Sequence, residues 1–279
     1  MKIYKYWARS SATVQKGEKR WDISSTAGSD TGLAEAMALA REKAEGIARM
    51  LSSGEKPPQY TYTERPLQEE LIGEITDAGQ LIGAITRNSY GSLVLNAASV
   101  MFVDIDCKPP GCLAGLFGIF GGGPKQQKEI VERVKSVAET TPGLGLRLYQ
   151  TAAGYRGLIT SGTHDPTSAE TRALLERFGS DPLYVKLCAG QACFRARLTP
   201  KFWRCSAPRP PSRYPWANAE EEARYRKWEK DYADCAKDYA TCSLVGSFGS
   251  AQMDARVQKI LEVHDRFACD PTDELADLA

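Results

Sequence analysis

The first 90 residues combine strand-like alternation with one long segment of helical spacing. Strands over residues 2–9 and 19–25 flank a glycine-containing turn and form a predicted hairpin. Apolar residues recur at every third or fourth position over 33–51 and predict an amphipathic helix. A short helix over 67–75 and a strand over 81–87 follow, so this part is predicted to mix helices and strands.

The clearest order of elements lies in the middle of the chain. Residues 94–106 form a long apolar run, rich in β-branched residues and followed by two prolines, which is typical of a buried strand. The pattern then predicts a helix, two strands joined by a tight turn, a helix and a strand (125–139, 144–150, 155–160, 168–178 and 182–187). This β-α-β-β-α-β order is that of a ferredoxin-like or RRM-like palm, a fold that hosts many unrelated functions.

The rest of the chain predicts one more strand, a proline-rich linker and two helices. The strand covers 193–198, the linker 208–215, and the helices 218–232 and 253–267. The predicted fold class is therefore α+β. It has three parts, which are an N-terminal α/β subdomain, a palm-like core, and a linker with C-terminal helices (1–90, 91–205 and 206–279).

Composition places the chain among ordinary globular proteins and indicates no partner. Its 279 residues are 42% apolar and 25% charged, which excludes collagen-like, coiled-coil and wholly disordered chains. The 36 Lys and Arg residues balance the 35 Asp and Glu residues, so the net charge gives no sign of nucleic acid or membrane. No apolar run is long enough to span a bilayer or to act as a secretory signal, and eight cysteines are too few for a disulfide scaffold. We expect a cytoplasmic protein with reduced thiols and no membrane partner.

The segment VMFVDID, at the end of the long apolar run, carries two acidic residues. Asp104 and Asp106 alternate with Val103 and Ile105, so both carboxylates are expected on one face of the strand. Two like charges on a buried strand are unfavourable unless a cation lies between them. Oxygen ligands favour Mg²⁺ or Mn²⁺ as this cation, whereas solvation or pairing with a neighbouring lysine is the simpler alternative.

A basic stretch is concealed by the balanced net charge. Residues 182–219 contain no Asp or Glu and seven basic residues, which are Lys186, Arg195, Arg197, Lys201, Arg204, Arg209 and Arg213. Four aromatic residues lie among them, namely Phe202, Trp203, Tyr214 and Trp216. This mixture suits phosphate contacts and base stacking, whereas the alternative is a basic surface paired with the acidic helix that follows.

These motifs together resemble the archaeo-eukaryotic primase superfamily, which includes the primase-polymerases. In that family two acids at the end of a strand and a third acid downstream hold divalent ions, and VDID matches the first motif at Asp104 and Asp106. The segment DPLYVKLCAGQACFR is similar to the third motif, which implies that Asp181 is the third acid and Arg195 its companion arginine. The resemblance covers roughly residues 94–200.

The second motif of the family differs in this chain. The hairpin TAAGYRGLIT has the shape of the family's GxRGxH motif, but Ile159 stands where the family has a phosphate-contacting histidine. His164 comes five residues later, in a predicted loop. Nucleotide transfer would therefore need phosphate contacts from other basic residues, and the candidates are Arg156, Lys186, Arg195 and Arg197.

Three other motifs give weaker signals. The glycine-rich loop over 116–125 precedes a helix but lacks the GK[ST] of a Walker loop, so a connector or lid is the simpler interpretation. His264 and Asp265 form an isolated pair without the second His/Asp cluster of metal phosphohydrolases. Five cysteines could hold zinc, but their loose spacing favours ordinary buried thiols (Cys188, Cys193, Cys205, Cys235 and Cys242).

The leading hypothesis is a metal-dependent nucleotidyltransferase of the primase-polymerase type. Asp104, Asp106 and Asp181 would hold Mg²⁺ or Mn²⁺, and the partners would be nucleoside triphosphates and a single strand or primed template. Two alternatives stay open. One is a non-catalytic protein that binds single-stranded nucleic acid on the same fold, and the other is a metal-dependent nuclease or nucleotide hydrolase.

Overall fold

The structure is a computed structural model that describes residues 1, 3–57, 66–107, 123–269 and 277–279. These residues form six α-helices and twelve strands, so the predicted α+β class is confirmed. Cys112 and most of the predicted glycine-rich loop lie outside the described residues. None of the helices in the described ranges is long and apolar enough to cross a bilayer.

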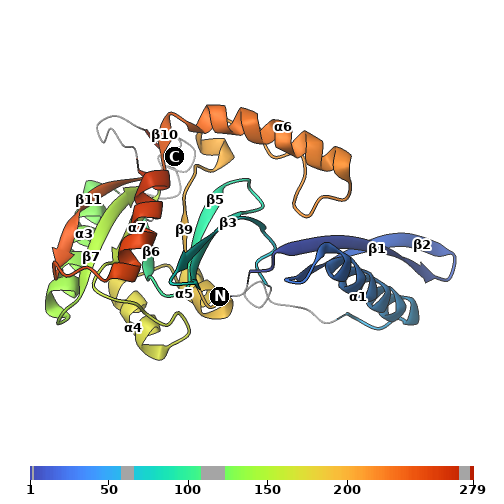
Figure 1. The fold of residues 1–279 in the computed structure, drawn as a ribbon, viewed down its shortest axis with the longest axis horizontal. Coiled ribbons are helices and arrows are strands. Elements are labelled where there is room, and N and C mark those ends of the chain that lie inside the picture. Colours follow the sequence, from blue (N-terminus) through green and yellow to red (C-terminus); the bar gives the residue numbers. More distant parts are fainter. Residues whose placement is uncertain (2, 58–65, 108–122, 270–276) are drawn as a thin grey trace.

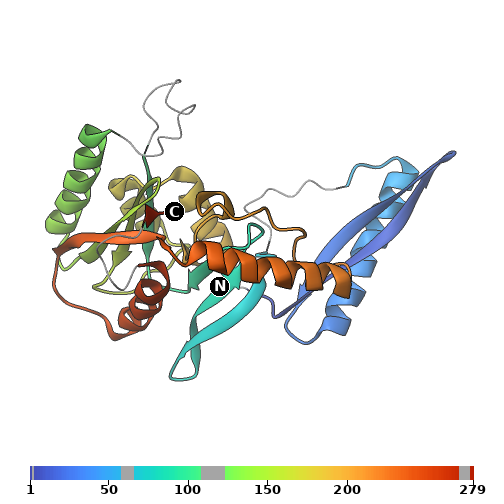
Figure 2. The same cartoon turned by 90° about the horizontal axis from the view of Figure 1, so that it is seen from above.

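The N-terminal part forms an arm that extends from the rest of the molecule (Figures 1 and 2). Strands β1 (Tyr6–Lys16) and β2 (Lys19–Ser29) make the predicted antiparallel hairpin, and helix α1 (Leu33–Ser53) packs along it. The buried residues of α1 are all alanines, which allow the helix to lie close to the hairpin (Ala36, Ala40, Ala44 and Ala48). The helix ends at Gly54, as predicted, in a left-handed conformation.

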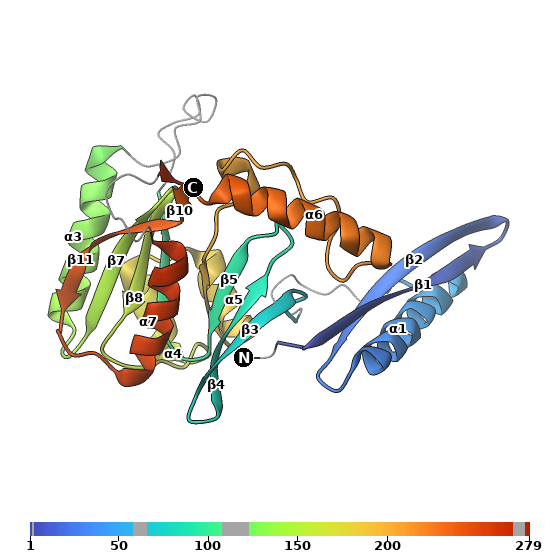
Figure 3. The ribbon, with the colours of Figure 1, turned by 45° about the horizontal axis from the view of Figure 1, so that its top comes forward.

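Two four-stranded antiparallel sheets form the centre of the molecule. The first sheet has the order β3-β4-β5-β9, with strands Glu70–Asp77, Gln80–Arg87, Leu93–Ala97 and Phe194–Arg197. The second sheet has the order β11-β7-β8-β6, with strands Cys242–Gly249, Gly145–Thr151, Gly154–Ile159 and Phe102–Asp106. Figure 3 shows α7 (Ala255–Ala268) on one face of the second sheet and α3 (Pro124–Thr140) and α4 (Ala169–Phe178) toward the other.

The predicted single strand over 94–106 is wrong, because β5 and β6 belong to different sheets. The chain crosses between them at residues 98–101. Backbone groups of the crossing stay paired, since the Ala98 N–H donates to the Ile82 carbonyl and the Met101 carbonyl accepts from the Ile159 N–H. Val100 and Met101 are as buried as the two strands, which explains why apolar residues continue through the crossing in the sequence.

Two further predictions of secondary structure are wrong. Residues 67–75, predicted as a helix, contain most of β3, and residues 182–187, predicted as a strand, lie in helix α5 (Pro182–Gln191). The Asp181 side chain accepts from the Tyr184 N–H, and Pro182 occupies the first helical position, so both residues favour a helix start. The last strand of the predicted β-α-β-β-α-β palm is therefore absent, and β9 pairs with β5 in the other sheet. The ferredoxin-like topology is not confirmed.

The C-terminal residues join both sheets. Helix α6 (Ala219–Ala236) is held to the first sheet by ion pairs between two arginines and two glutamates (Arg87, Arg226, Glu70 and Glu229). Strand β11, which the sequence did not predict, extends the second sheet beside β7, and β10 (Tyr239–Ala240) pairs in parallel with β12 (Asp277–Leu278). The first sheet also combines strands from both sides of residue 90, so the three predicted parts share sheets.

Candidate functional site

Two acidic residues lie on the face of β6 that α7 covers. Asp104 is opposite Arg156 in the β6–β8 ladder, and the side chain of Arg156 reaches His264 on α7. Because alternate residues of a strand share a face, Asp106 lies on the same side as Asp104. Asp104 is half-buried and Asp106 is exposed at the end of the strand.

The start of α5 brings the third predicted acid to this place. The Asp181 N–H donates to the Asp104 carbonyl at 2.8 Å. The Ser180 hydroxyl donates to the same carbonyl at 2.9 Å and accepts from the Asp104 N–H at 3.2 Å. One carboxylate oxygen of Asp181, Oδ2, caps α5 by accepting from the Tyr184 N–H at 2.9 Å. Asp181 thus has a structural role and also adds its charge to the site.

Burial and neighbouring charges affect the ionisation of Asp104 and Asp106. Burial raises the pKa of both Asp104 and Asp106, and the charge of Asp181 adds to both shifts. Four basic residues act in the opposite direction (Arg156, Arg197, Lys201 and Arg204). Across the described ranges, neither the Asp104 nor the Asp106 carboxylate makes a hydrogen bond or an ion pair with another side chain. The three acids do not form a ready cluster of metal ligands among the described residues, so their side chains would have to move for a divalent cation to bridge them.

The basic residues near the acids come from β9 and the segment after it. Burial lowers the pKa of Arg197 to about 10 and that of Lys201 to about 8, and the charges of neighbouring arginines add to both shifts. Burial also lowers the pKa of Arg204, while the charge of Asp106 opposes that shift. Acids of the second sheet therefore face cations carried by the first sheet and its continuation.

The predicted phosphate-binding residues have different surroundings. Arg195 is paired with Glu69, whose two carboxylate oxygens both lie 2.7 Å from its Nη2, and Lys186 is exposed on α5. Arg156 is buried, and its Nη1 donates to the Arg197 carbonyl at 2.9 Å. Of the four candidates, Arg197 and Arg156 are the two whose charges act on Asp104. Lys201 and Arg204 belonged to the basic stretch, but the sequence did not indicate that they face the acids.

No histidine contacts the acids. Ile159, at the position of the family's histidine, is fully buried. The His164 N–H donates to the Ser99 carbonyl, which lies before β6, at the opposite end of the strand from Asp106. His264 lies beneath Arg156 and is fully buried. Arginine and lysine are therefore the side chains available for phosphate contacts among the described residues of this site.

An aromatic pocket of about 240 Å³ continues from the basic residues. It is lined by aromatic, arginine, serine and proline residues from two segments (Ser89, Tyr90, Phe202, Trp203, Arg209, Pro210, Ser212 and Arg213). Tyr90 and Trp203 are 46% and 48% exposed and meet edge to face with their ring centres 5.4 Å apart. The Lys201 ammonium lies 5.2 Å from the centre of the Trp203 ring, so this pocket adjoins one of the cations whose charges act on the acids. We refer to it as the aromatic pocket.

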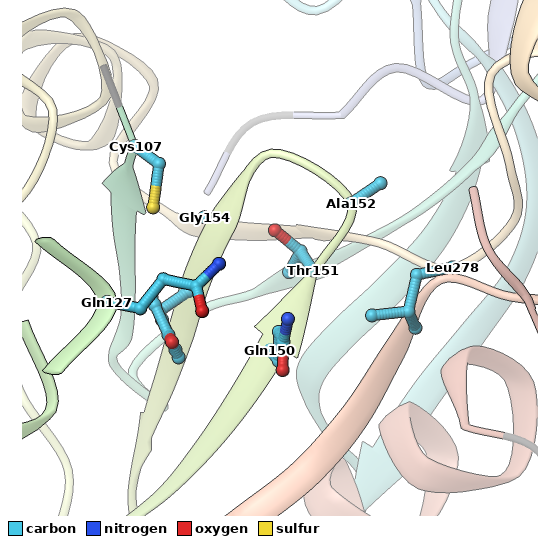
Figure 4. Close-up of a pocket in the computed structure, with 8 residues that line it drawn as sticks. Cys107, Gln127, Gln150, Thr151, Ala152, Gly154 and Leu278 are labelled. Atoms are coloured by element: carbon cyan, nitrogen blue, oxygen red, sulfur yellow. The ribbon is translucent and has the colours of Figure 1, made fainter. Parts of the chain in front are cut away.

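Figure 4 shows a second pocket, of about 250 Å³, at the turn between β7 and β8. It is lined by Gln150 of β7 and Tyr155 of β8, which are opposite each other in the β7–β8 ladder, and by Gln127 of α3. These two strand residues are adjacent to Tyr149 and Arg156, so they occupy the opposite face of the sheet from Asp104. The predicted site residues do not line this pocket.

Comparison with known proteins does not assign the chain to a family. No protein-family model, curated protein or solved structure matches the chain.

The lowered pKa of Lys201 gives a test of whether the basic residues near the acids bind phosphate groups. Since Lys201 is charged below about pH 8 and neutral above it, affinity for a fluorescent ATP analogue is expected to fall about tenfold between pH 7 and pH 9. Asp104, Asp106, Arg197 and Arg204 are the charged groups that act on Lys201. The arginine in the variant Lys201→Arg stays charged over this range, so the variant's affinity for the ATP analogue should be the same at pH 7 and pH 9. An equal slope in the variant and the wild type, measured by fluorescence anisotropy, would contradict this assignment.

Proposed function

We propose that the protein is a metal-dependent nucleotidyltransferase that acts on nucleic acid. The observation that carries the proposal is the backbone contact between Asp181 and Asp104, together with the charges of Asp181 and of cations from a different sheet, which act on Asp104 and Asp106. Acids alone would repel a polyphosphate, and cations alone would only bind it. Both together suit a triphosphate bound through divalent ions.

The residues divide into two groups in this proposal. Asp104, Asp106 and the free Oδ1 of Asp181 are oxygen ligands suited to Mg²⁺ or Mn²⁺. Such ions, when bound, would activate a 3′-hydroxyl and stabilise the departing pyrophosphate. A second group, Arg197, Lys201 and Arg204, would bind the phosphates and keep the triphosphate oriented toward the acids.

The aromatic pocket is the proposed contact for a single strand. Its exposed rings can stack with bases, and Arg209 and Arg213 can contact the phosphate backbone. Replacing Trp203 with alanine is expected to weaken binding of a fluorescent single-stranded oligonucleotide about tenfold, in EDTA as well as in Mn²⁺. Trp21→Ala is the matched control, because Trp21 is 40% exposed on the distant arm. Equal losses in both variants would show that the aromatic pocket has no specific part in binding.

The direct test is extension of a primed template with labelled nucleotides in Mg²⁺ or Mn²⁺. Incorporation by the wild-type protein supports the proposal, and its absence with both metals overturns it. Release of nucleoside monophosphates instead would identify the nuclease or nucleotide hydrolase alternative.

A second candidate is a non-catalytic protein that binds single strands. The buried Ile159 favours it, because β8 offers no imidazole to an incoming phosphate. Metal-independent and salt-sensitive binding without turnover would select this function.

A further inference from the structure

A cluster of two cysteines and a histidine lies between the second sheet and α7. Cys242 begins β11, His264 lies within α7, and Cys269 follows the end of that helix. Their side-chain ligand atoms all lie within 4.8 Å of one another. The distances from the Cys242 sulfur to the Cys269 sulfur and to the His264 Nε2 are both 3.8 Å.

The two distances from the Cys242 sulfur match those of a tetrahedral zinc site. Zn–S bonds of about 2.3 Å and Zn–N bonds of about 2.0 Å place two thiolates about 3.8 Å apart and a thiolate and imidazole about 3.5 Å apart. A disulfide instead requires sulfurs about 2.05 Å apart, so the cluster is far from that geometry. Thiolate and imidazole are ligands that select Zn²⁺ over Mg²⁺ or Mn²⁺.

The surroundings of His264 also suit a metal ligand. Its Nδ1 lies 2.8 Å from the Asp265 Oδ1, and this carboxylate is fixed by the Tyr149 hydroxyl at 2.8 Å and by Arg147 at 2.9 Å. Such a carboxylate holds the proton on Nδ1 and turns Nε2 toward the cysteines, as the outer partner of a zinc-bound histidine does. His264 and Cys242 are fully buried and Cys269 is partly exposed, so water can reach the cluster through its Cys269 side.

We propose that Cys242, His264 and Cys269 bind one zinc ion. In the structure, Arg156 Nη1 lies 3.0 Å from His264 Nε2, and the ion would replace this hydrogen bond. Arg156 would keep its bond to the Arg197 carbonyl and its contact with the Cys242 sulfur at 4.0 Å. Two thiolates balance the charge of the ion, and Arg156 remains as a hydrogen-bond donor to one of them. The described residues supply three ligands, so the fourth position is open to water or another ligand.

The ligands of this site differ from the residues of the proposed nucleotidyl transfer, and Arg156 lies between the two sites. It would join the first residue of β11 to the end of α7, and so hold the helix against the sheet behind Arg156. Metal bound in this way stabilises the native state, because an unfolded chain lacks the assembled site.

The test is the metal content of the full-length protein, incubated with Zn²⁺ and passed through a desalting column. We expect about one zinc per chain by mass spectrometry in the wild type and in Cys235→Ser, and a loss of most of it in Cys269→Ser. Cys235 is the matched control, because it is partly buried like Cys269 but lies on α6. Co²⁺-loaded wild-type protein should show thiolate-to-metal charge-transfer absorption, which does not depend on any variant folding.

Three results would overturn the proposal. The first is no zinc and no Co²⁺ absorption in the wild type. The second is zinc content in Cys269→Ser equal to that of the wild type. The third is a metal-free protein in which a thiol titration, in denaturant and EDTA, finds two fewer free thiols than the eight cysteines of the chain. That result would mean that a Cys242–Cys269 disulfide occupies the site.

Discussion

Asp104→Asn should lower Mn²⁺-dependent nucleotide incorporation about 1,000-fold while leaving the protein folded. The amide keeps the shape of the carboxylate but removes a charged ligand, and metal-ion stabilisation of a transition state is worth several kcal/mol. The rise in melting temperature caused by Mn²⁺ should disappear with the activity. Asp231→Asn, an exposed acid on α6, should change neither quantity.

The same variant has an expected effect on stability without metal. Because the folded-state pKa of Asp104 is raised, the native state binds more protons than the unfolded chain as pH falls through that pKa. The wild type should therefore gain free energy of unfolding relative to Asp104→Asn, in which this group no longer titrates, as the pH falls from 7 to about 4, the pKa of an unperturbed aspartate. Urea unfolding at the two pH values measures the difference. Identical pH dependences would show that the carboxylate is solvated in the native protein.

Gly154→Ala should be the most destabilising single-methyl substitution near the site. A Cβ atom on Gly154 would lie 2.0 Å from the Ile105 carbonyl oxygen, so the backbone of β6 or β8 must move. We expect a loss of about 3 kcal/mol in the free energy of unfolding, measured with urea. Gly154 is opposite Asp106 in the β6–β8 ladder, so the shift also displaces an acid of the site, and the Mn²⁺-induced rise in melting temperature should decrease.

Gly162→Ala is the control for this substitution. A Cβ atom there meets nothing within 4 Å, so the change in stability should stay within about 0.5 kcal/mol. Equal stability of the two variants would mean that the β6–β8 ladder accommodates a methyl group between Gly154 and the Ile105 carbonyl.

Elements with strong local signals could be predicted from the sequence. Helix α4 is an example, because Ser168 caps its N-terminus and Gly179 ends it in a left-handed conformation. The same kind of signal was present at Asp181 and Pro182, but the apolar residues that follow favoured a strand. Strand β11 has no regular alternation in CSLVGSFG, so only its pairing with β7 defines it.

The residues of the candidate site also differ in whether a local sequence pattern predicts them. The shared face of Asp104 and Asp106 follows from alternation alone, whereas Asp181 entered only through a family resemblance. The positions of Lys201 and Arg204 depend on how two sheets meet, which no local pattern encodes. The Cys242, His264 and Cys269 cluster likewise joins distant segments, and the spacing between its members matches no short motif.

The crossing at residues 98–101 places the two halves of the site on one continuous stretch of chain. The strand that carries Asp104 and Asp106 continues directly from β5, and β5 pairs with β9, which carries Arg197. Arg156 of β8 donates to the Arg197 carbonyl of β9, and the Tyr184 hydroxyl contacts the backbone of both Phe102 and Arg195. The two sheets are therefore joined by hydrogen bonds beside the site, so the distance between its acids and its cations is set by the packing of one sheet on the other.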